Sequence, residues 1–232
     1  MPDFSPHTEL LRSLGRLVRG LSALFWGLPI ALVIGVQTAR TDTLHSLGGM
    51  PPILVTGWLM VGLWHLGYFH PGERIWQRAL DRCKFLGLIN LGLSPFIYWW
   101  NQMPEQGFFT VVVTVLAFNG LIFLDQLNVL LNRLTAMLPD EALRTETRHF
   151  TQLNRWLVFV IFVMGVSLGV FAHYPLLTPS FLDLPLLRAE GSHWLVVFLV
   201  LLPLAMTMAL LWKIKEMILD SVFGGPAGPT AG

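Results

Sequence analysis

The stretch "NGLIFLDQLNVLLNRL", residues 119–134, decides how this chain is arranged. It starts as an apolar run, reaches the carboxylate of Asp125 and continues as a mixture of leucines and amides. Beyond that point the apolar residues keep the i, i+3, i+4, i+7 spacing of a helix buried on one side. They are Leu124, Leu127, Leu130, Leu131, Leu134, Met137 and Leu138. Two interpretations of Asp125 follow: a carboxylate kept inside a membrane for function, or a marker of the point where a helix leaves the lipid.

The composition indicates a membrane protein. Of 232 residues, 54% are hydrophobic and only 12% are charged, and the mean hydropathy is +0.62. A soluble domain is less apolar than this. The formal net charge of +1 provides no basic surface of the kind that binds nucleic acid. The single cysteine, Cys83, excludes an intramolecular disulfide and any multi-cysteine metal site within this sequence.

Six segments come close to the length and polarity of a membrane-spanning helix. Such a helix needs about 17 to 25 mainly apolar residues, because each residue rises about 1.5 Å through a layer about 30 Å thick. The segments are 20–39, 53–69, 85–100, 107–124, 156–174 and 193–212. We therefore predict an all-α polytopic bundle of six transmembrane helices over 20–223. An amphipathic cytoplasmic segment, 1–19, precedes it, and a flexible tail, 224–232, follows.

The basic residues predict the orientation of this bundle. Positive charge near helix ends is retained on the cytoplasmic side of a membrane. With six crossings, 13 of the 15 Lys and Arg residues fall on one side, and only Arg40 and Arg188 fall on the other. Removing or adding one crossing would destroy this split. We therefore expect both termini in the cytoplasm of a bacterial-type inner membrane.

The residues between the fourth and fifth segments predict a helical hairpin. The leucine pattern stops at Pro139 and Asp140 and resumes with Leu143, Phe150 and Leu153. Acidic side chains at the start of the second arm suit the positive end of a helix dipole. Residues 125–155 are therefore expected to form an antiparallel cytoplasmic hairpin that offers a surface to another protein.

Small residues recur every four positions in the first segment. They are Ala23, Gly27, Ala31, Gly35 and Ala39. Small side chains let helix backbones approach closely in lipid, where association depends on packing and interhelical contacts. This small-residue stripe predicts a tightly packed partner helix, either in the same chain or in another subunit.

Four polar side chains fall at a similar level, near the inner ends of their segments: His65, Asn90, Asp125 and Asn128. Burying such groups without partners is costly in a membrane. If they meet, a carboxylate that orients an imidazole forms a proton-relay or cation site, which supports a small transporter or an ion or proton channel. The competing interpretation places Asp125 at the headgroups and leaves His65 and Asn90 as bridges between helices.

His65 also supports a cofactor hypothesis. It stands in "GLWHLGYF", residues 62–69, where small and aromatic neighbours would admit a haem or a chlorophyll-type pigment with His65 as axial ligand. A haem held by two histidines needs a second ligand at a compatible depth, whereas His173 and His193 belong to the outer side. The residues predict no metal site.

Two further patterns have ordinary explanations. Arg74, Arg78 and Arg82 repeat along one helical face, which suits contact with anionic lipid or phosphate but is also the usual topology charge of a cytoplasmic loop. The sequence "GVSLG", residues 165–169, matches the G-x-S-x-G pattern of hydrolases. That chemistry needs Ser167 on a sharp strand-to-helix turn rather than in an apolar helix, so we predict no catalytic residue.

These features together predict a non-catalytic function. The small-residue stripe, the hairpin and the shortage of catalytic groups favour an integral membrane subunit, scaffold or assembly partner of a larger membrane complex. Its expected partners are membrane lipids and other membrane subunits or further copies of the chain, but not nucleic acid. Transport through the polar cluster, and haem or pigment binding at His65, are the alternatives.

Overall fold

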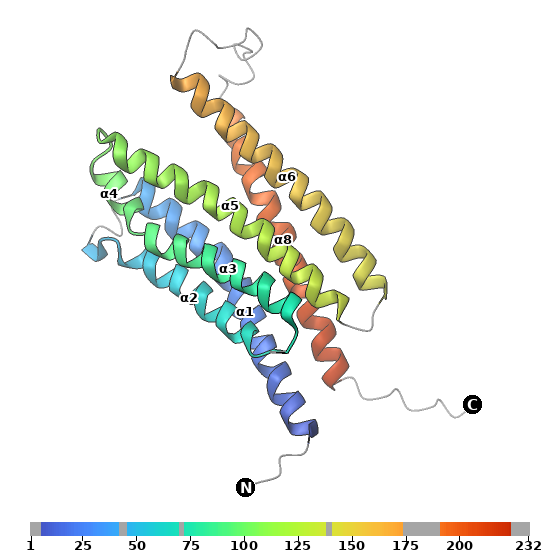
Figure 1. Cartoon of the computed structure of the whole chain (residues 1–232). Coiled ribbons are helices and arrows are strands. Elements are labelled where there is room, and N and C mark those ends of the chain that lie inside the picture. Colours follow the sequence, from blue (N-terminus) through green and yellow to red (C-terminus); the bar gives the residue numbers. More distant parts are fainter. Residues whose placement is uncertain (1–5, 42–45, 70–71, 138–140, 174–190, 224–232) are drawn as a thin grey trace.

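The computed structural model describes residues 6–41, 46–69, 72–137, 141–173 and 191–223, and every regular element within them is a helix. The elements are α1 (Pro6–Arg40), α2 (Met50–Gly67), α3 (Arg74–Leu93), α4 (Phe96–Gln102), α5 (Gly107–Ala136), α6 (Glu141–His173) and α8 (Gly191–Phe223). The long helices run side by side as an antiparallel bundle, with α2 and α3 on one side and α6 on the other (Figure 1). The predicted all-α helical bundle is confirmed.

Within the described residues, five helices are long and apolar enough to cross a membrane. They are Arg12–Arg40, Met50–Gly67, Gly107–Ala136, Arg144–Ser167 and Phe198–Asp220. Their outer faces carry large exposed apolar side chains, including Trp26 on α1, Trp58 on α2 and Phe159 on α6. A helix that is apolar on its outer face as well as on its packed face is typical of a lipid surrounding. The combination of length and exposed apolar surface is that of a multi-pass membrane protein.

The expected span 85–100 is not a single helix. α3 ends at Leu93, and Pro95 separates it from the short helix α4. Proline has no backbone N–H and its ring clashes with the preceding turn, so it ends the helix here. α4 continues at the end of α3 and packs against α1 and α5 (Figure 1). This segment therefore differs from the other five in being broken near one end.

The expected N-terminal segment is not separate from the first span. α1 runs for 35 residues without a break, so the part of segment 1–19 that the structure describes continues directly into the membrane helix. α5 likewise continues past Asp125 to Ala136, as its leucine spacing predicts. The end of the expected hairpin, 138–140, lies outside the described residues. Its two arms lie beside α8, and both α1 and α8 reach further at this end (Figure 1).

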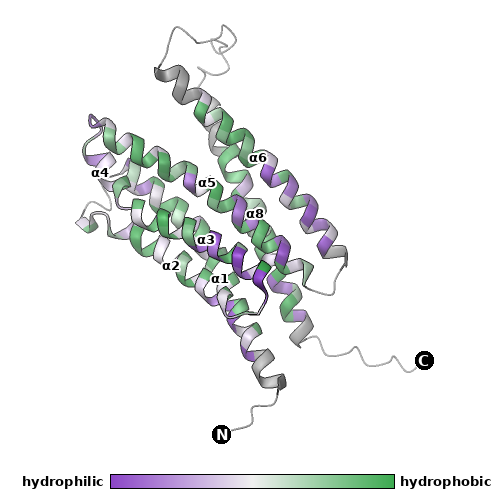
Figure 2. Ribbon diagram, viewed as in Figure 1, coloured by the Kyte–Doolittle hydropathy of each residue, from purple (hydrophilic) through white to green (hydrophobic). Residues whose placement is uncertain are grey.

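Hydrophilic residues gather at one end of the bundle, on the first turns of α3 and on the first half of α6 (Figure 2). We call this the basic end, because Arg12, Arg16 and Arg19 of α1 and Arg74 of α3 also lie there. The most deeply buried side chains occupy the half of the bundle nearest to it. Leu17, Leu21, Leu24, Leu63, Leu66, Leu80, Leu127, Leu130, Leu131, Leu134, Leu211 and Ile214 are each at most 1% exposed. This half forms the solid core of the molecule.

The small-residue stripe of α1 faces two different surroundings. At its first member, a Cβ added to Gly62 of α2 would stand 3.2 Å from the Cβ of Ala23. Gly20, which precedes the stripe, is as close: its added Cβ would stand 2.9 Å from the carbonyl oxygen of Gly62. Gly27 is similarly covered by Leu59. Further along, Ala31 and Gly35 line a cavity, and Ala39 is partly buried. The tight partner of the first part is therefore α2 of the same chain.

Candidate functional site

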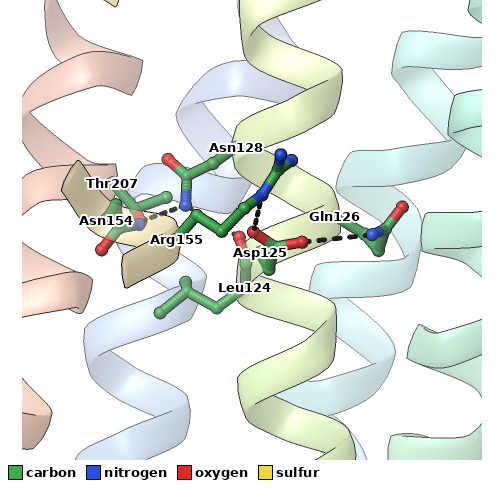
Figure 3. Close-up of polar contacts among 7 residues, drawn as sticks. All are labelled: Leu124, Asp125, Gln126, Asn128, Asn154, Arg155 and Thr207. Atoms are coloured by element: carbon green, nitrogen blue, oxygen red, sulfur yellow. Dashed lines mark hydrogen bonds and ion pairs between the residues drawn. The ribbon is translucent and has the colours of Figure 1, made fainter. Parts of the chain in front are cut away.

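A network of hydrogen bonds joins α5, α6 and α8 through three buried polar side chains, Asn128, Asn154 and Thr207 (Figure 3). The amide nitrogen of Asn128 donates to the carbonyl of Leu124 at 2.8 Å and to Thr207 Oγ1 at 2.9 Å. Asn154 Nδ2 donates to the same hydroxyl at 3.3 Å, and this hydroxyl donates to the carbonyl of Pro203 at 2.8 Å. Thr207 therefore uses its donor and both acceptor positions, which fixes the three helices relative to one another.

The carboxylate of Asp125 forms an ion pair with Arg155 next to this network (Figure 3). Arg155 Nε donates to Oδ1 at 3.1 Å, and the neighbouring amide of Gln126 donates to Oδ2 at 3.2 Å. The Asp125 side chain is 18% exposed and that of Arg155 is 58% exposed. A pair with one exposed partner suits the edge of the lipid better than its interior, because the guanidinium can reach water.

Asn90 lies elsewhere, in an interface between α3 and α5. Its side-chain oxygen accepts a hydrogen bond at 2.8 Å from Asn119 Nδ2, which also donates to the carbonyl of Leu86 at 3.0 Å. Asn119 is only 8% exposed. The backbone carbonyl of Leu86 can only accept a hydrogen bond, so the group of Asn119 that faces it must be the side-chain nitrogen. The group of Asn90 that faces this nitrogen must then be its side-chain oxygen.

His65 is bound within its own helix. Its Nδ1 lies 2.8 Å from the carbonyl oxygen of Val61. The four polar residues that the sequence groups together therefore occupy three separate places: His65 on α2, Asn90 with Asn119, and Asp125 beside Asn128 on α5. No hydrogen bond or ion pair described in the structure joins His65 or Asn90 to Asp125.

A row of buried oxygens runs along the inner face of α6. Thr147 Oγ1, Thr151 Oγ1 and Asn154 Oδ1 have no hydrogen-bond partner in the described part of the chain. They are spaced by four and three residues, so they lie on one helical face. Buried oxygens of this kind require water or another donor. The row extends the polar network toward the basic end.

A cavity of about 660 Å³ lies between the helices in the half of the bundle opposite the basic end. Its walls are mainly apolar, and its volume falls in the range of small-molecule sites. It is lined by Leu28, Ala31, Leu32 and Gly35 of α1, Pro52, Thr56, Leu59, Met60 and Leu63 of α2, Gly87, Asn90 and Ser94 of α3, Ile97 and Trp100 of α4, residues of α5 between Thr110 and Leu124, Ile161 and Gly165 of α6, and Val200 and Leu204 of α8.

The remaining candidates have simple surroundings. Arg74, Arg78 and Arg82 are all exposed on α3, opposite the buried Trp76 and Cys83. Ser167 donates to the carbonyl of Val163 at 2.8 Å within α6, so it has the helical setting that the hydrolase motif does not tolerate. Within the described residues, no group of three or more His, Cys, Asp and Glu side chains is arranged to hold a metal ion. The side chains of His173 and His193 lie outside what the structure describes.

Comparisons of the chain with protein-family models, with curated proteins and with solved structures find no match. The chemistry and geometry of the chain's own residues therefore remain the basis for inferring a function.

Sequence reasoning did not select Asn119, Thr207 or the cavity. Asn119 and Thr207 are isolated polar residues in apolar helices, a weak signal because many such residues only bond to their own helix. Arg155 is one of the 13 basic residues that predict the orientation. It lies one residue outside the predicted span 156–174, and Asp125 lies one residue outside the predicted span 107–124. These matching positions would have predicted the ion pair.

Proposed function

We propose that this chain is a non-catalytic integral membrane subunit that crosses a bacterial-type inner membrane six times, with both termini in the cytoplasm, and that packs against another membrane protein. The observation that carries the proposal is a row of exposed apolar side chains on α6, which we call the α6 stripe: Phe150, Leu153, Trp156, Val160 and Val163. It continues beyond the level of the Asp125–Arg155 pair.

The directions of the helices support six crossings. α1, α2, the α3–α4 pair, α5, α6 and α8 alternate in direction through the bundle (Figure 1). Because the helices alternate in direction, the 13 Lys and Arg residues that the sequence analysis counts on one side of the membrane all fall at the basic end. The rule that positive charge stays in the cytoplasm then assigns the basic end to the cytoplasmic side.

Aromatic side chains support two membrane interfaces. Near the basic end, the guanidinium of Arg16 lies 4.7 Å from the ring centre of Tyr68, and Lys215 and Lys84 lie 5.5 and 6.0 Å from the rings of Trp212 and Trp64. At the other end, the rings of Phe96, Trp99, Phe108 and Phe109 cluster. Aromatic belts with flanking basic residues mark the headgroup level. Along α5 the distance from Phe108 to Asp125 is about 26 Å at the helical rise, close to the lipid thickness.

The apolar stripe on α6 supports a protein partner. Within the lipid layer, Trp156, Val160 and Val163 face outward, as lipid requires. The same helix also exposes 61% of Leu153 and 37% of Phe150 on the cytoplasmic side of Arg155. Large apolar side chains exposed to water in a continuous patch mark interaction sites. A helix of a partner that lies along this stripe would cover both parts.

The experiment is a comparison of two neighbouring substitutions on α6. Leu153→Glu places a charge in the stripe, whereas Gln152→Glu places the same charge on the adjacent exposed position. In mild detergent the wild-type chain and Gln152→Glu should migrate as one assembly of defined size on a native gel, and Leu153→Glu should migrate as the 26.1 kDa chain alone. A wild-type chain that is already monomeric, or a Leu153→Glu variant that keeps the assembly, would refute the proposed interface.

The two alternative functions, transport through the polar cluster and haem or pigment binding at His65, have less structural support. A channel that uses His65, Asn90 and Asp125 together needs contacts among them, but the three lie apart. A haem or pigment ligated by His65 needs an open site at its ring, but His65 does not line the cavity. For these reasons the subunit hypothesis has the stronger support.

A further inference from the structure

The wall of the cavity between α1, α2, α3 and α5 has one feature that a space filled by lipid chains does not need: a side-chain amide whose hydrogens have no described acceptor. Asn90 lines the cavity, and its oxygen is already used as the acceptor of the hydrogen bond from Asn119. Its nitrogen, Nδ2, therefore carries the hydrogens that remain available, and no acceptor for them is described in the structure. A ligand with a hydrogen-bond acceptor would satisfy this group.

Three other polar side chains of the cavity wall already donate hydrogen bonds to backbone carbonyls of their own helices. Ser94 donates to the carbonyl of Leu91 at 2.9 Å. Thr56 donates to the carbonyl of Pro52 at 2.7 Å, and Thr114 donates to that of Thr110, also at 2.7 Å. These side chains therefore line the wall without requiring a ligand, and Asn90 is the group that would orient one.

The walls of the cavity favour a flat molecule. Glycines from four helices line it: Gly35 of α1, Gly87 of α3, Gly120 of α5 and Gly165 of α6. A Cβ added to Gly120 would meet nothing within 4 Å, and a Cβ on Gly35 would meet only Ile97, at 4.0 Å. Trp100 adds an aromatic surface at the end nearest α4. Small residues beside aromatic ones leave room for a ring system.

The depth of Asn90 excludes the ester carbonyl of an ordinary phospholipid. Asn90 lies six residues beyond Lys84, which marks the cytoplasmic aromatic belt. At the helical rise this is about 9 Å inside the hydrocarbon. Lipid ester groups stay at the edge of that layer, about 15 Å from its centre. An acceptor that reaches Asn90 must therefore belong to a molecule dissolved in the lipid.

We propose that this cavity binds a membrane-soluble ring compound whose carbonyl oxygen accepts a hydrogen bond from Nδ2 of Asn90. Isoprenoid quinones and keto-substituted pigments share this chemistry. The site is independent of His65 and of the interface on α6, so it goes beyond the function proposed above.

The test uses the full chain in nanodiscs of phosphatidylethanolamine and phosphatidylglycerol, with a decyl-substituted benzoquinone as the probe. We expect saturable uptake of one probe per chain beyond the uptake of empty discs, and a carbonyl infrared band shifted to lower frequency by the hydrogen bond. Asn90→Leu should weaken binding about 3- to 10-fold and remove the shifted band. Uptake equal to that of empty discs, or an unshifted band, would overturn the proposal.

A second pair of variants tests the cavity without disturbing the two amides. Gly35→Phe projects a ring into the cavity from α1, and Gly92→Phe adds the same ring at an exposed position of α3 with nothing within 4 Å. We expect Gly35→Phe to weaken uptake more than 10-fold and Gly92→Phe to bind as the wild type does. Equal binding by both variants would place the probe elsewhere. If Asn90→Leu fails to fold, this pair decides the question.

Solvent extraction of the chain purified from its native membrane identifies the source of the carbonyl. A quinone in the extract, or a keto-substituted pigment in the extract, would support the site and would name its occupant. Only phospholipid in the extract, together with no probe uptake above empty discs, would refute it.

Discussion

At the scale of single residues, the account depends on Asp125. Its carboxylate contacts Arg155 and Gln126 rather than His65 or Asn90, which favours a structural group at the edge of the lipid over a proton relay inside it. The polar side chains beyond it, Asn128 and Thr207, are buried and paired across helices. They hold α5 and α8 together where both helices approach the basic end.

Cys83 provides a prediction at the same scale. This thiol is fully buried in the charged first half of α3, and burial, with a smaller effect of the Asp125 carboxylate, raises its pKa from 9.0 to about 12. At pH 9 about 0.1% of the folded protein would carry the reactive thiolate, compared with half of an ordinary thiol. We expect maleimide labelling in mild detergent to stay negligible from pH 7 to pH 9 and to become complete in sodium dodecyl sulfate.

The sign of the pH effect on stability follows from the same pKa. The folded state holds the proton of Cys83 more tightly than the unfolded state does. The contribution of Cys83 to the free energy of unfolding is therefore complete below pH 9 and is lost as the pH rises from 9 towards 12. Rapid labelling of the folded protein at pH 8 would show that the thiol is open to solvent and would contradict this packing.

At the scale of helices, the contact between α1 and α2 is a close approach of two backbones. Gly20 allows it, because an added Cβ would stand 2.5 Å from Leu66 Cδ1 and 2.9 Å from a backbone oxygen of α2. Backbone cannot move aside as a flexible side chain can. We therefore expect Gly20→Ala to destabilise the bundle by about 1–3 kcal/mol, the usual cost of overpacking.

Gly15→Ala is the matched control for that prediction, because it lies on the same helix with nothing within 4 Å of an added Cβ. Thermal unfolding in detergent, followed by circular dichroism, should show a lower midpoint for Gly20→Ala and an equal or higher one for Gly15→Ala, because alanine favours a helix more than glycine does. Equal midpoints for the two variants would mean that the two helices do not touch at Gly20.

The sequence predicts helices and their buried faces better than it predicts their partners. The leucine spacing after Asp125 predicts the burial of Leu127, Leu130 and Leu134, since periodicity depends on one helix alone. The small-residue stripe predicts a close neighbour but cannot identify α2, because the choice of neighbour depends on the whole bundle. Pro95 is tolerated in some membrane helices, so its presence alone does not establish that α3 ends there.

At the scale of the whole molecule, the two halves of the bundle differ. The half at the basic end is filled with leucines, whereas the other half encloses the cavity. The break at Pro95 contributes to this difference, because α4 supplies two residues of the cavity wall, Ile97 and Trp100. A cavity of this kind arises from the arrangement of several helices and leaves no local pattern, so it could not be predicted from the sequence.

The six-crossing topology is the central claim, because the orientation of the α6 stripe and the depth of Asn90 both depend on it. The broken segment α3–α4 is the crossing to test, and the loops on its two sides expose Gly72 and Glu105. The native Cys83 is buried and should not react with a maleimide, so labelling reports only on an introduced cysteine. With a membrane-impermeant maleimide, the account predicts that Glu105→Cys reacts in intact cells and that Gly72→Cys reacts only after the membrane is permeabilised. Labelling of both positions from the same side would contradict it.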